Sequence, residues 1–160
     1  KKGFFLSMAF HYTTQSIILK KQDQGEANRS FTVFTKDFGK LSLWATSQRK
    51  ITSKLRGGLE LFSLSQLSFV QGKNKKVLVE AVSLEQYLVP LQNLSCFKEA
   101  LCIAHLVDEH MGEQEKDQGV WELLEQSFSE LKKGSAPEEV HLSFAPRFMT
   151  LAGYGKEVFA

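Results

Sequence analysis

Four cations lie close together in one segment of the chain that contains no acidic residue. Residues 47–58 carry Arg49, Lys50, Lys54 and Arg56, with Ser and Thr among them and two glycines at the end. Like charges in one loop repel each other, so the segment lowers stability unless an anion compensates it. Guanidinium, ammonium and hydroxyl groups are the donors that proteins use for phosphate oxygens. The segment therefore predicts a loop that binds a phosphate backbone, with a merely solvated basic surface as the alternative.

Charge is divided unevenly along the chain. Residues 11–79 hold 12 Lys or Arg and 4 Asp or Glu, a balance of +8, whereas residues 80–160 hold 6 and 14, a balance of −8. This split indicates a basic module for nucleic acid joined to an acidic module with other partners, although simple drift of surface charge is the alternative. The candidate nucleic-acid contacts outside the loop are Lys20, Lys21, Arg29, Lys40, Lys73, Lys75 and Lys76.

Trp44 is the aromatic residue that best suits contact with unpaired bases. It follows Leu43 in an alternating segment, so the two side chains point to opposite faces of a strand and one of them leaves the core. An exposed aromatic ring beside cations can stack on bases. The alternative is that Trp44 closes one end of the core. We expect four other aromatic residues to be buried: Phe31, Phe34, Phe62 and Phe69.

The sequence predicts neither an enzyme nor a metal site. His105 and His110 are five residues apart and do not share a helix face, while Cys102 and His105 share one but supply only two ligands. Cys96 and Cys102 lie in a helical pattern and are expected to be reduced thiols of a cytoplasmic protein. No glycine-rich phosphate loop, paired-carboxylate motif or nucleophile elbow occurs. We therefore expect no catalytic residue, no metal and no cofactor.

The basic residues must be positioned by strands. Five short strands separated by turns are predicted at 15–23, 29–35, 41–46, 59–71 and 75–82. Five strands in about 70 residues favour a small closed barrel of the OB type, whose sheet face and loops bind oligonucleotides. We assign this domain to residues 13–83, after an N-terminal extension of residues 1–12.

The pattern becomes helical after residue 83, and residues 84–160 are assigned to a small α-helical domain. A short helix or turn is predicted at 84–92, followed by a helix at 96–111 that begins at Ser95 and stops at Gly112. A second, amphipathic helix covers 120–133. The fold class is thus a five-stranded OB-fold barrel followed by a small α-helical domain.

A last helix is predicted after Gly134. Ser135 and Glu138 form a capping-box pattern, with Pro137 at the first helical position. Pro146 lies inside this helix and should kink or split it, because proline lacks the amide hydrogen and clashes with the preceding turn.

Several of these segments, taken in order, resemble the N-terminal OB domain of the bacterial DNA repair protein RecO family, and the helical region resembles the continuation of that family. The likeness runs from residue 13 to about residue 155. It rests on Gly25-Glu26-Ala27-Asn28-Arg29, on Phe34-Thr35 with Gly39-Lys40-Leu41, on Arg49-Lys50 with Ser53-Lys54-Leu55, and on Leu151-Ala152-Gly153-Tyr154-Gly155.

The resemblance implies a recombination mediator in the DNA damage response, located in the cytoplasm with the nucleoid. Such proteins bind single- and double-stranded DNA, anneal complementary strands, contact the acidic tail of single-stranded-DNA-binding protein, and act with RecR to load RecA. Members usually continue into a four-cysteine zinc module, so we expect a short form without that module. By the same resemblance, Arg49, Lys50, Lys54 and Arg56 match the basic loop of the family.

A second hypothesis is a protein-interaction adaptor. In this interpretation the barrel is a scaffold and a groove between the acidic helices accepts an apolar peptide, such as the tail of single-stranded-DNA-binding protein. The residues expected to line the groove are Trp121, Phe128, Phe144 and Phe148.

Overall fold

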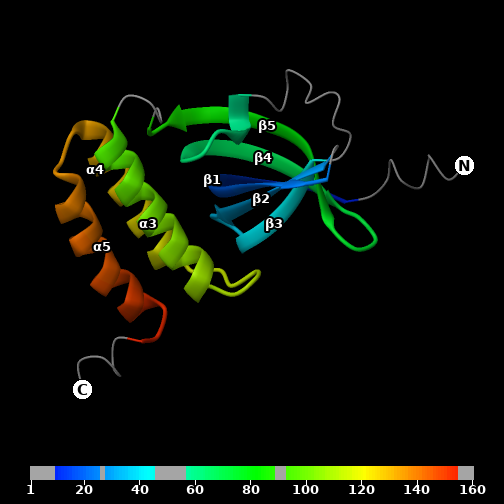
Figure 1. Cartoon of the computed structure of the whole chain (residues 1–160). Helices are drawn as coiled ribbons and strands as arrows, with labels where there is room; N and C mark the ends of the chain where they lie inside the picture. The colour runs from blue at the N-terminus through cyan, green and yellow to red at the C-terminus, as the bar shows by residue number, and fades with distance from the viewer. Residues whose placement is uncertain (1–9, 26–27, 46–56, 89–92, 155–160) are drawn as a thin grey trace, which may run out of the picture.

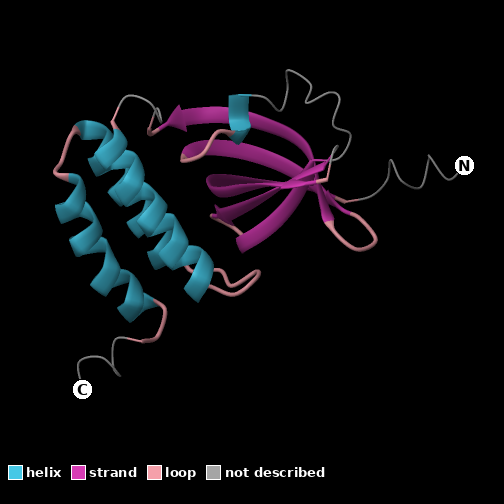
Figure 2. Ribbon diagram, viewed as in Figure 1, coloured by secondary structure: helices cyan, strands magenta, loops and turns pink. Residues whose placement is uncertain are grey.

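The protein consists of a closed β-barrel followed by three α-helices that pack against one side of it (Figures 1 and 2). The structure is a computed structural model and describes residues 10–25, 28–45, 57–88 and 93–154. Its elements are β1 (His11–Gln24), β2 (Asn28–Thr35), β3 (Gly39–Ala45), η2 (Gly57–Leu59), β4 (Ser63–Gln71), β5 (Lys76–Gln86), α3 (Leu94–His110), α4 (Gln118–Lys133) and α5 (Pro137–Leu151). The predicted fold class is confirmed.

The strands close in the order β1-β2-β3-β5-β4, which is a five-stranded OB-type barrel. All neighbouring strands are antiparallel except β3 and β5. These two run parallel and pair only at Leu43–Lys76 and Trp44–Val77, and we call this short ladder the β3–β5 seam. The barrel therefore closes along one seam of two residue pairs.

Three strand predictions are corrected by the structure. β1 begins at His11, four residues before the predicted start and inside the predicted N-terminal extension. Residues 57–59 form the 3-10 turn η2, and β4 begins only at Ser63. β5 continues to Gln86, so the beginning of the segment predicted as a short helix or turn is strand. Residues 89–92 of that segment lie outside the described residues.

Alternating apolar side chains fill the barrel. Ile18 of β1, Phe31 of β2, Leu43 of β3 and Leu67 of β4 are all buried inside it. β1 is buried on its other face as well, because Ile17 and its neighbours pack against the helices. A strand covered on both sides reads as a continuous apolar run, as it does here.

The helices form a second core against the outside of the barrel. α3 lies beside β1, and α5 packs on α3 and α4 on the side of the helices remote from the barrel (Figure 1). Phe62 connects the two modules, because its ring lies 5.3 Å from that of Phe97 on α3 and 5.4 Å from that of Phe128 on α4. The phenylalanines expected in the core, Phe31, Phe34, Phe62 and Phe69, are all buried.

The helix ends differ in detail from the predicted ones. Asn93, rather than Ser95, caps α3 by accepting a hydrogen bond from the Cys96 amide at 3.1 Å. α3 ends at His110, two residues before the predicted stop at Gly112. An Asn or Ser at the right backbone position can cap equally well, so composition alone does not separate them.

The predicted start of α5 is half correct. Pro137 does occupy the first turn, but the Ser135 hydroxyl donates to Glu130 at 2.7 Å and makes no capping box. Pro146 lies inside α5 without splitting it.

The α3–α4 connection is fixed to the edge of β3. The Gln114 amide donates to the Lys40 carbonyl at 2.8 Å, and the Ser42 amide donates to the Glu113 carboxylate at 3.2 Å. Gly39 has φ +73°, and a Cβ there would lie 2.3 Å from the Glu115 carbonyl oxygen. The turn before β3 thus requires glycine for its conformation and for this contact.

Candidate nucleic-acid interface

The basic loop predicted as the centre of the interface lies outside the described residues. Arg49, Lys50, Lys54 and Arg56 all fall in residues 46–56. The structure does show where this segment is attached. It leaves the barrel at Ala45, the last residue of β3, and rejoins it at η2, which packs against β4 and β5.

Trp44 lies on the outer face of the barrel, one residue before this attachment point. Its neighbours Leu43 and Ala45 point inward and are buried, whereas the indole is partly exposed. The alternative in which Trp44 closes the end of the core is therefore wrong. The Lys75 ammonium lies 4.1 Å from the centre of the Trp44 ring, within the range of a cation–π contact.

The β3–β5 seam explains why residues 31 positions apart in the chain meet. The pairing of Trp44 with Val77 places the start of β5, and the β4–β5 turn before it, against the end of β3. Lys73 and Lys75 of that turn are exposed, and Lys76 is partly buried at the first position of β5. The outer face around Trp44 and Lys75, together with Lys73 of the turn and with Lys76, whose side chain lines the adjacent barrel mouth, is called the seam surface below.

Arg29 of β2 lies near the seam surface but on the opposite face of the sheet from Trp44. It pairs across the ladder with Ala45, and its neighbour Ser30 pairs with Trp44. Its guanidinium Nε donates to Asp23 at 2.8 Å, an exposed ion pair of the kind that contributes little to stability. A phosphate can compete with such a pair, so Arg29 remains a candidate contact.

Three other predicted contacts do not join this surface. Lys21 pairs with Glu60 at 3.4 Å. Lys40 donates to the Asp108 carbonyl at 2.7 Å and holds α3 against the barrel, which corrects its expected position in the interface. Lys20 is exposed, but it lines a small hollow between β1 and α3.

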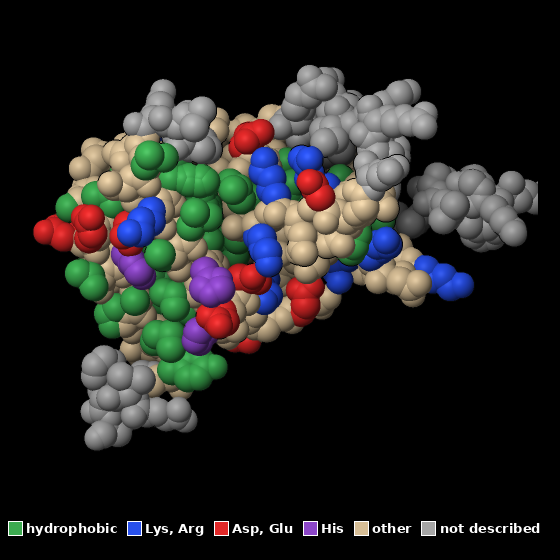
Figure 3. Space-filling model, viewed as in Figure 1, with side chains coloured by type: hydrophobic (Ala, Val, Ile, Leu, Met, Phe, Trp, Pro, Cys, Tyr) green, Lys and Arg blue, Asp and Glu red, His purple; other side chains and the backbone are tan. Residues whose placement is uncertain are grey.

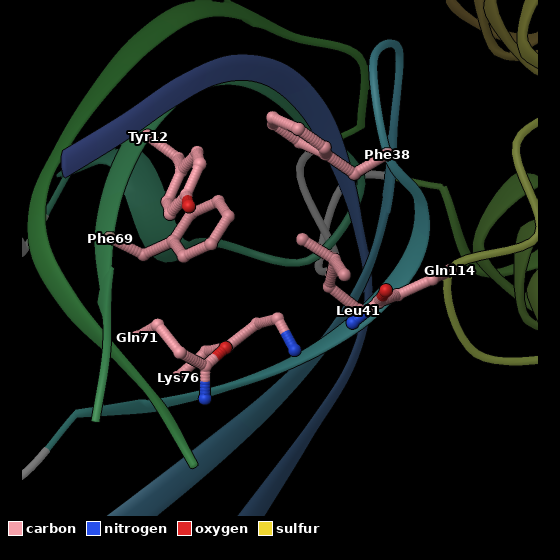
Figure 4. A pocket seen from close by; sticks show the side chains of 7 residues that line it. All are labelled: Tyr12, Phe38, Leu41, Phe69, Gln71, Lys76 and Gln114. Carbon is pink, nitrogen blue, oxygen red and sulfur yellow. The ribbon is translucent and has the colours of Figure 1, made fainter. Parts of the chain in front are cut away.

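An aromatic cavity opens at the mouth of the barrel beside the β4–β5 turn, and the sequence reasoning missed it. Its volume is about 280 Å³. Tyr12, Phe38 and Phe69 point into it, with ring centroids 5.4–5.8 Å apart, and Lys76 and Gln71 line its rim (Figure 4). The sequence signal for this cavity is Phe38, a large aromatic residue in a turn between Asp37 and Gly39, where a polar residue is more usual.

Charge is distributed over the surface broadly as the sequence suggests. On the face seen in Figure 3, Lys and Arg side chains gather over the barrel with a few acids among them, while hydrophobic and His side chains gather over the helices. None of the helices in the described part of the chain is long and apolar enough to span a bilayer.

The groove expected between the helices is filled by the side chains assigned to it. Each is at most 1 % exposed, and Phe144 stacks on Phe148 with centroids 5.4 Å apart. They form the helical core and do not line an open groove in the described structure. The residues concerned are Trp121, Phe128, Phe144 and Phe148.

Three ionisable groups in or beside the helical core have raised pKa values, and they lie away from the seam surface. Burial raises the pKa of Tyr87 to about 12, with smaller contributions from Glu85 and Glu125. Burial also raises the pKa of Glu125, although nearby Lys36 opposes the shift. Burial likewise raises the pKa of the Cys96 thiol. Each of these groups packs into or against the helical core, so we assign them a structural role.

Comparison with known proteins covers nearly the whole chain. Residues 8–87 match the family model described as Recombination protein O N terminal, and residues 99–159 match the one described as Recombination protein O C terminal. The first match spans the barrel and the second spans the helices.

Curated relatives agree with these matches. The chain is 30% identical over 147 residues to a protein of Dehalococcoides mccartyi, covering 92% of this chain and 58% of the relative. It is 28% identical over 147 residues to one of Desulforudis audaxviator, covering 92% and 59%, and 36% identical over 97 residues to one of Heliobacterium modesticaldum, covering 61% and 36%. Each of these relatives is named DNA repair protein RecO.

The chain spans somewhat more than half the length of the relatives from Dehalococcoides mccartyi and Desulforudis audaxviator. The matches cover both the barrel and the helices in chain order. On this basis, the chain belongs to the recombination protein O family.

Proposed function

We propose that this chain binds DNA at the seam surface and that the binding serves recombinational repair. The observation that carries the proposal is the contact between the Lys75 ammonium and the outward-facing Trp44 ring at 4.1 Å. A ring and a cation on one surface are the two groups that single-stranded nucleic acid requires, one for a base and one for a phosphate. The basic segment at residues 47–58 begins three residues after Trp44 in the sequence.

Binding would replace the contact between Lys75 and the Trp44 ring by a contact between Lys75 and DNA. Lys75 moves from the indole to a phosphate oxygen, and an unpaired base stacks on the ring face that the ammonium leaves. Stacking is tolerant of sequence because every base has a π face, and phosphate contacts carry no base code. The expected behaviour is therefore affinity for DNA of any sequence, with steep dependence on salt.

The finer part of the proposal follows from family membership. We infer that the protein holds both single- and double-stranded DNA, promotes annealing of complementary strands, and assists loading of RecA together with RecR and single-stranded-DNA-binding protein. Neutralised phosphates lower the repulsion between two strands, which is the physical requirement of annealing. In this role the protein works by binding alone and is not an enzyme.

The adaptor hypothesis receives less support. Its groove depended on four aromatic side chains that form the helical core. A partner peptide would have to use the exposed leucines of the helices instead, and of these Leu101 lines only the small hollow between β1 and α3.

A salt titration with labelled single-stranded DNA tests the proposed site. We expect the variant with Lys73, Lys75 and Lys76 replaced by Ala to lose affinity for all sequences alike. Each lost phosphate contact should reduce the slope of log affinity against log salt by roughly 0.7, so the slope should fall by about 2.

The matched control removes the same charge elsewhere. Lys98, Lys116 and Lys133 are exposed lysines of the helical region, and their triple replacement by Ala should leave the slope nearly unchanged. Equal losses in the two variants would show that net charge, rather than the seam surface, controls binding.

A further inference from the structure

Three side chains of different metal-binding chemistry meet between α3 and α5, away from the seam surface. Glu99 and Cys102 project from α3 and His141 from α5, and their ligand atoms all lie within 4.8 Å of one another. The His141 Nδ1 lies 2.6 Å from a Glu99 carboxylate oxygen. Glu99 retains 12% of its side-chain exposure and His141 29%, so the cluster is half-buried and still reachable from solvent.

The helix geometry holds these residues in place. Glu99 and Cys102 are three positions apart and therefore lie on one face of α3. His141 sits in the first turns of α5, next to Val140, which is buried in the helical core. In the sequence, Cys102 shares a helix face with His105, and that pair supplies only two ligands. In the structure His105 is not part of the cluster. The third ligand comes from a helix about 40 residues later, which no local spacing could indicate.

We propose that Glu99, Cys102 and His141 bind a zinc ion. A thiolate, an imidazole and a carboxylate are the three ligand types of protein zinc sites, and the thiolate disfavours magnesium and calcium, which prefer oxygen. Three protein ligands leave a fourth position for water or for an incoming group. The site differs from the four-cysteine module that the family resemblance implies, because it uses one carboxylate, one cysteine and one histidine.

The distances require only small movements. Bonds of about 2.0–2.3 Å to a tetrahedral zinc ion place ligand atoms roughly 3.3–3.8 Å apart. The Nδ1–Oε distance of 2.6 Å would open and the longer separations, none above 4.8 Å, would close, each by about 1 Å. The ion replaces the proton shared by Glu99 and His141, the thiol proton is released, and α3 becomes linked to α5 through three coordinate bonds.

Cobalt provides a direct test, because Co²⁺ occupies zinc sites and reports thiolate coordination by absorption. Titration of the full chain with Co²⁺ under reducing conditions should produce a thiolate charge-transfer band and tetrahedral d–d bands. They should saturate at one cobalt per chain, and added Zn²⁺ should abolish them. No thiolate band, or saturation at one cobalt per two chains, would overturn the proposal.

The two cysteines supply a matched pair of variants. Cys102→Ser should abolish the thiolate band, whereas Cys96→Ser should retain it, because Cys96 lies in the helical core. His141→Gln should weaken cobalt binding at least tenfold, and His105→Gln, which changes an exposed histidine of α3, should leave binding unchanged. A band that survives Cys102→Ser would contradict the assignment.

Thiol labelling gives a second readout that does not depend on cobalt spectra. Zn²⁺ should slow the reaction of Cys102 with a thiol reagent at least tenfold in the Cys96→Ser protein. It should raise the melting temperature of that protein but not of the His141→Gln variant. Labelling at the same rate with and without Zn²⁺ would reject the site.

Discussion

For Trp44, the sequence predicts that its side chain and that of Leu43 point to opposite faces of a strand, but it does not predict which of the two faces solvent. Both residues are apolar, so the strand alternation does not distinguish them. The structure resolves this through packing, because Leu43 fills the barrel and Trp44 meets Lys75. An exposed tryptophan on a barrel of this kind is a specific candidate for base stacking.

Trp44→Ala should weaken binding of single-stranded DNA by about 1–3 kcal/mol, the range measured for loss of one stacked base. Trp44→Phe should retain most of the affinity. Fluorescence anisotropy at one salt concentration measures the loss, and a salt series should show an unchanged slope, since no phosphate contact is removed.

Two comparisons keep this prediction specific. Replacing Tyr154, a partly exposed aromatic residue at the end of the helical region, by Ala should have little effect. Duplex DNA should lose less than single-stranded DNA in the Trp44→Ala protein, because paired bases do not present their faces. Equal losses on both substrates would count against stacking.

At the scale of elements, the connection between α3 and α4 joins the helices to the barrel through backbone contacts. The Gln114 amide bonds the Lys40 carbonyl, and Gly39 approaches Glu115 so closely that no side chain fits between them. The sequence predicts a turn between the strands at 29–35 and 41–46, where Gly39 lies. The second role of this turn, as a contact for a loop 75 residues away, could not be predicted, because nothing in the local pattern refers to that loop.

Gly39→Ala should destabilise the protein more than Gly25→Ala does. Both glycines have positive φ, at +73° and +85°, so both variants incur about 1–2 kcal/mol for placing a side chain in the left-handed region. A Cβ at position 25 meets nothing within 4 Å, whereas one at position 39 collides with the Glu115 backbone. We expect the Gly39 variant to lose about 3 kcal/mol or more.

Urea unfolding followed by circular dichroism measures both free energies, and the difference between them isolates the contact with the α3–α4 connection. If the two variants lose equal stability, the collision is relieved by movement of the loop, and the connection contributes little to holding the helices in place.

At the scale of the whole molecule, the barrel and the helices share β1, and Phe34 of β2 and Phe62 also pack into the helical core. β1 directs Ile18 into the barrel and Ile17 and Leu19 toward the helices. Tyr87 lies in the helical core at the end of β5, stacked on Phe128 with centroids 5.9 Å apart. We expect the barrel and the helices to unfold together, because separating them would expose the apolar side chains that each packs against the other.

The pH dependence of stability should report this buried tyrosine. Folding raises the pKa of Tyr87 from 10.0 to about 12, mainly through burial. The unfolded chain therefore loses the phenolic proton first. Stability is fully present below about pH 10 and is lost as pH rises toward about pH 12, by roughly 2 kcal/mol.

Comparing the protein with its Tyr87→Phe variant at about pH 9 and about pH 11 isolates that effect from the titration of lysines. The variant should lose less stability between the two conditions, and Tyr12→Phe should behave like the parent protein. Identical losses in the parent and the Tyr87 variant would show that the phenol ionises without unfolding.

The sequence shows that the barrel half is basic and the helical half acidic. It does not show which of these charges pair with each other inside the molecule and which face solvent. Part of the positive charge on the barrel is compensated inside the molecule, since Lys40 of the barrel pairs with Asp108 of α3. A pair also runs the other way, from Lys132 of α4 to Glu85 of β5. The remaining exposed cations of the β4–β5 turn are available to an external anion. The net charge of a module does not distinguish cations that pair with acids inside the molecule from cations that are open to an external anion, because it does not say which side chains meet.

The β3–β5 ladder consists of two residue pairs, and it is the shortest contact that keeps the cylinder shut. Trp44 belongs to one strand of it and Lys76 to the other, and Lys75 directly precedes Lys76. An oligonucleotide that stacks on the indole while its phosphates hold those lysines therefore spans the join and favours the closed cylinder over any form in which the two edges separate. By thermodynamic linkage, occupancy and closure must strengthen each other.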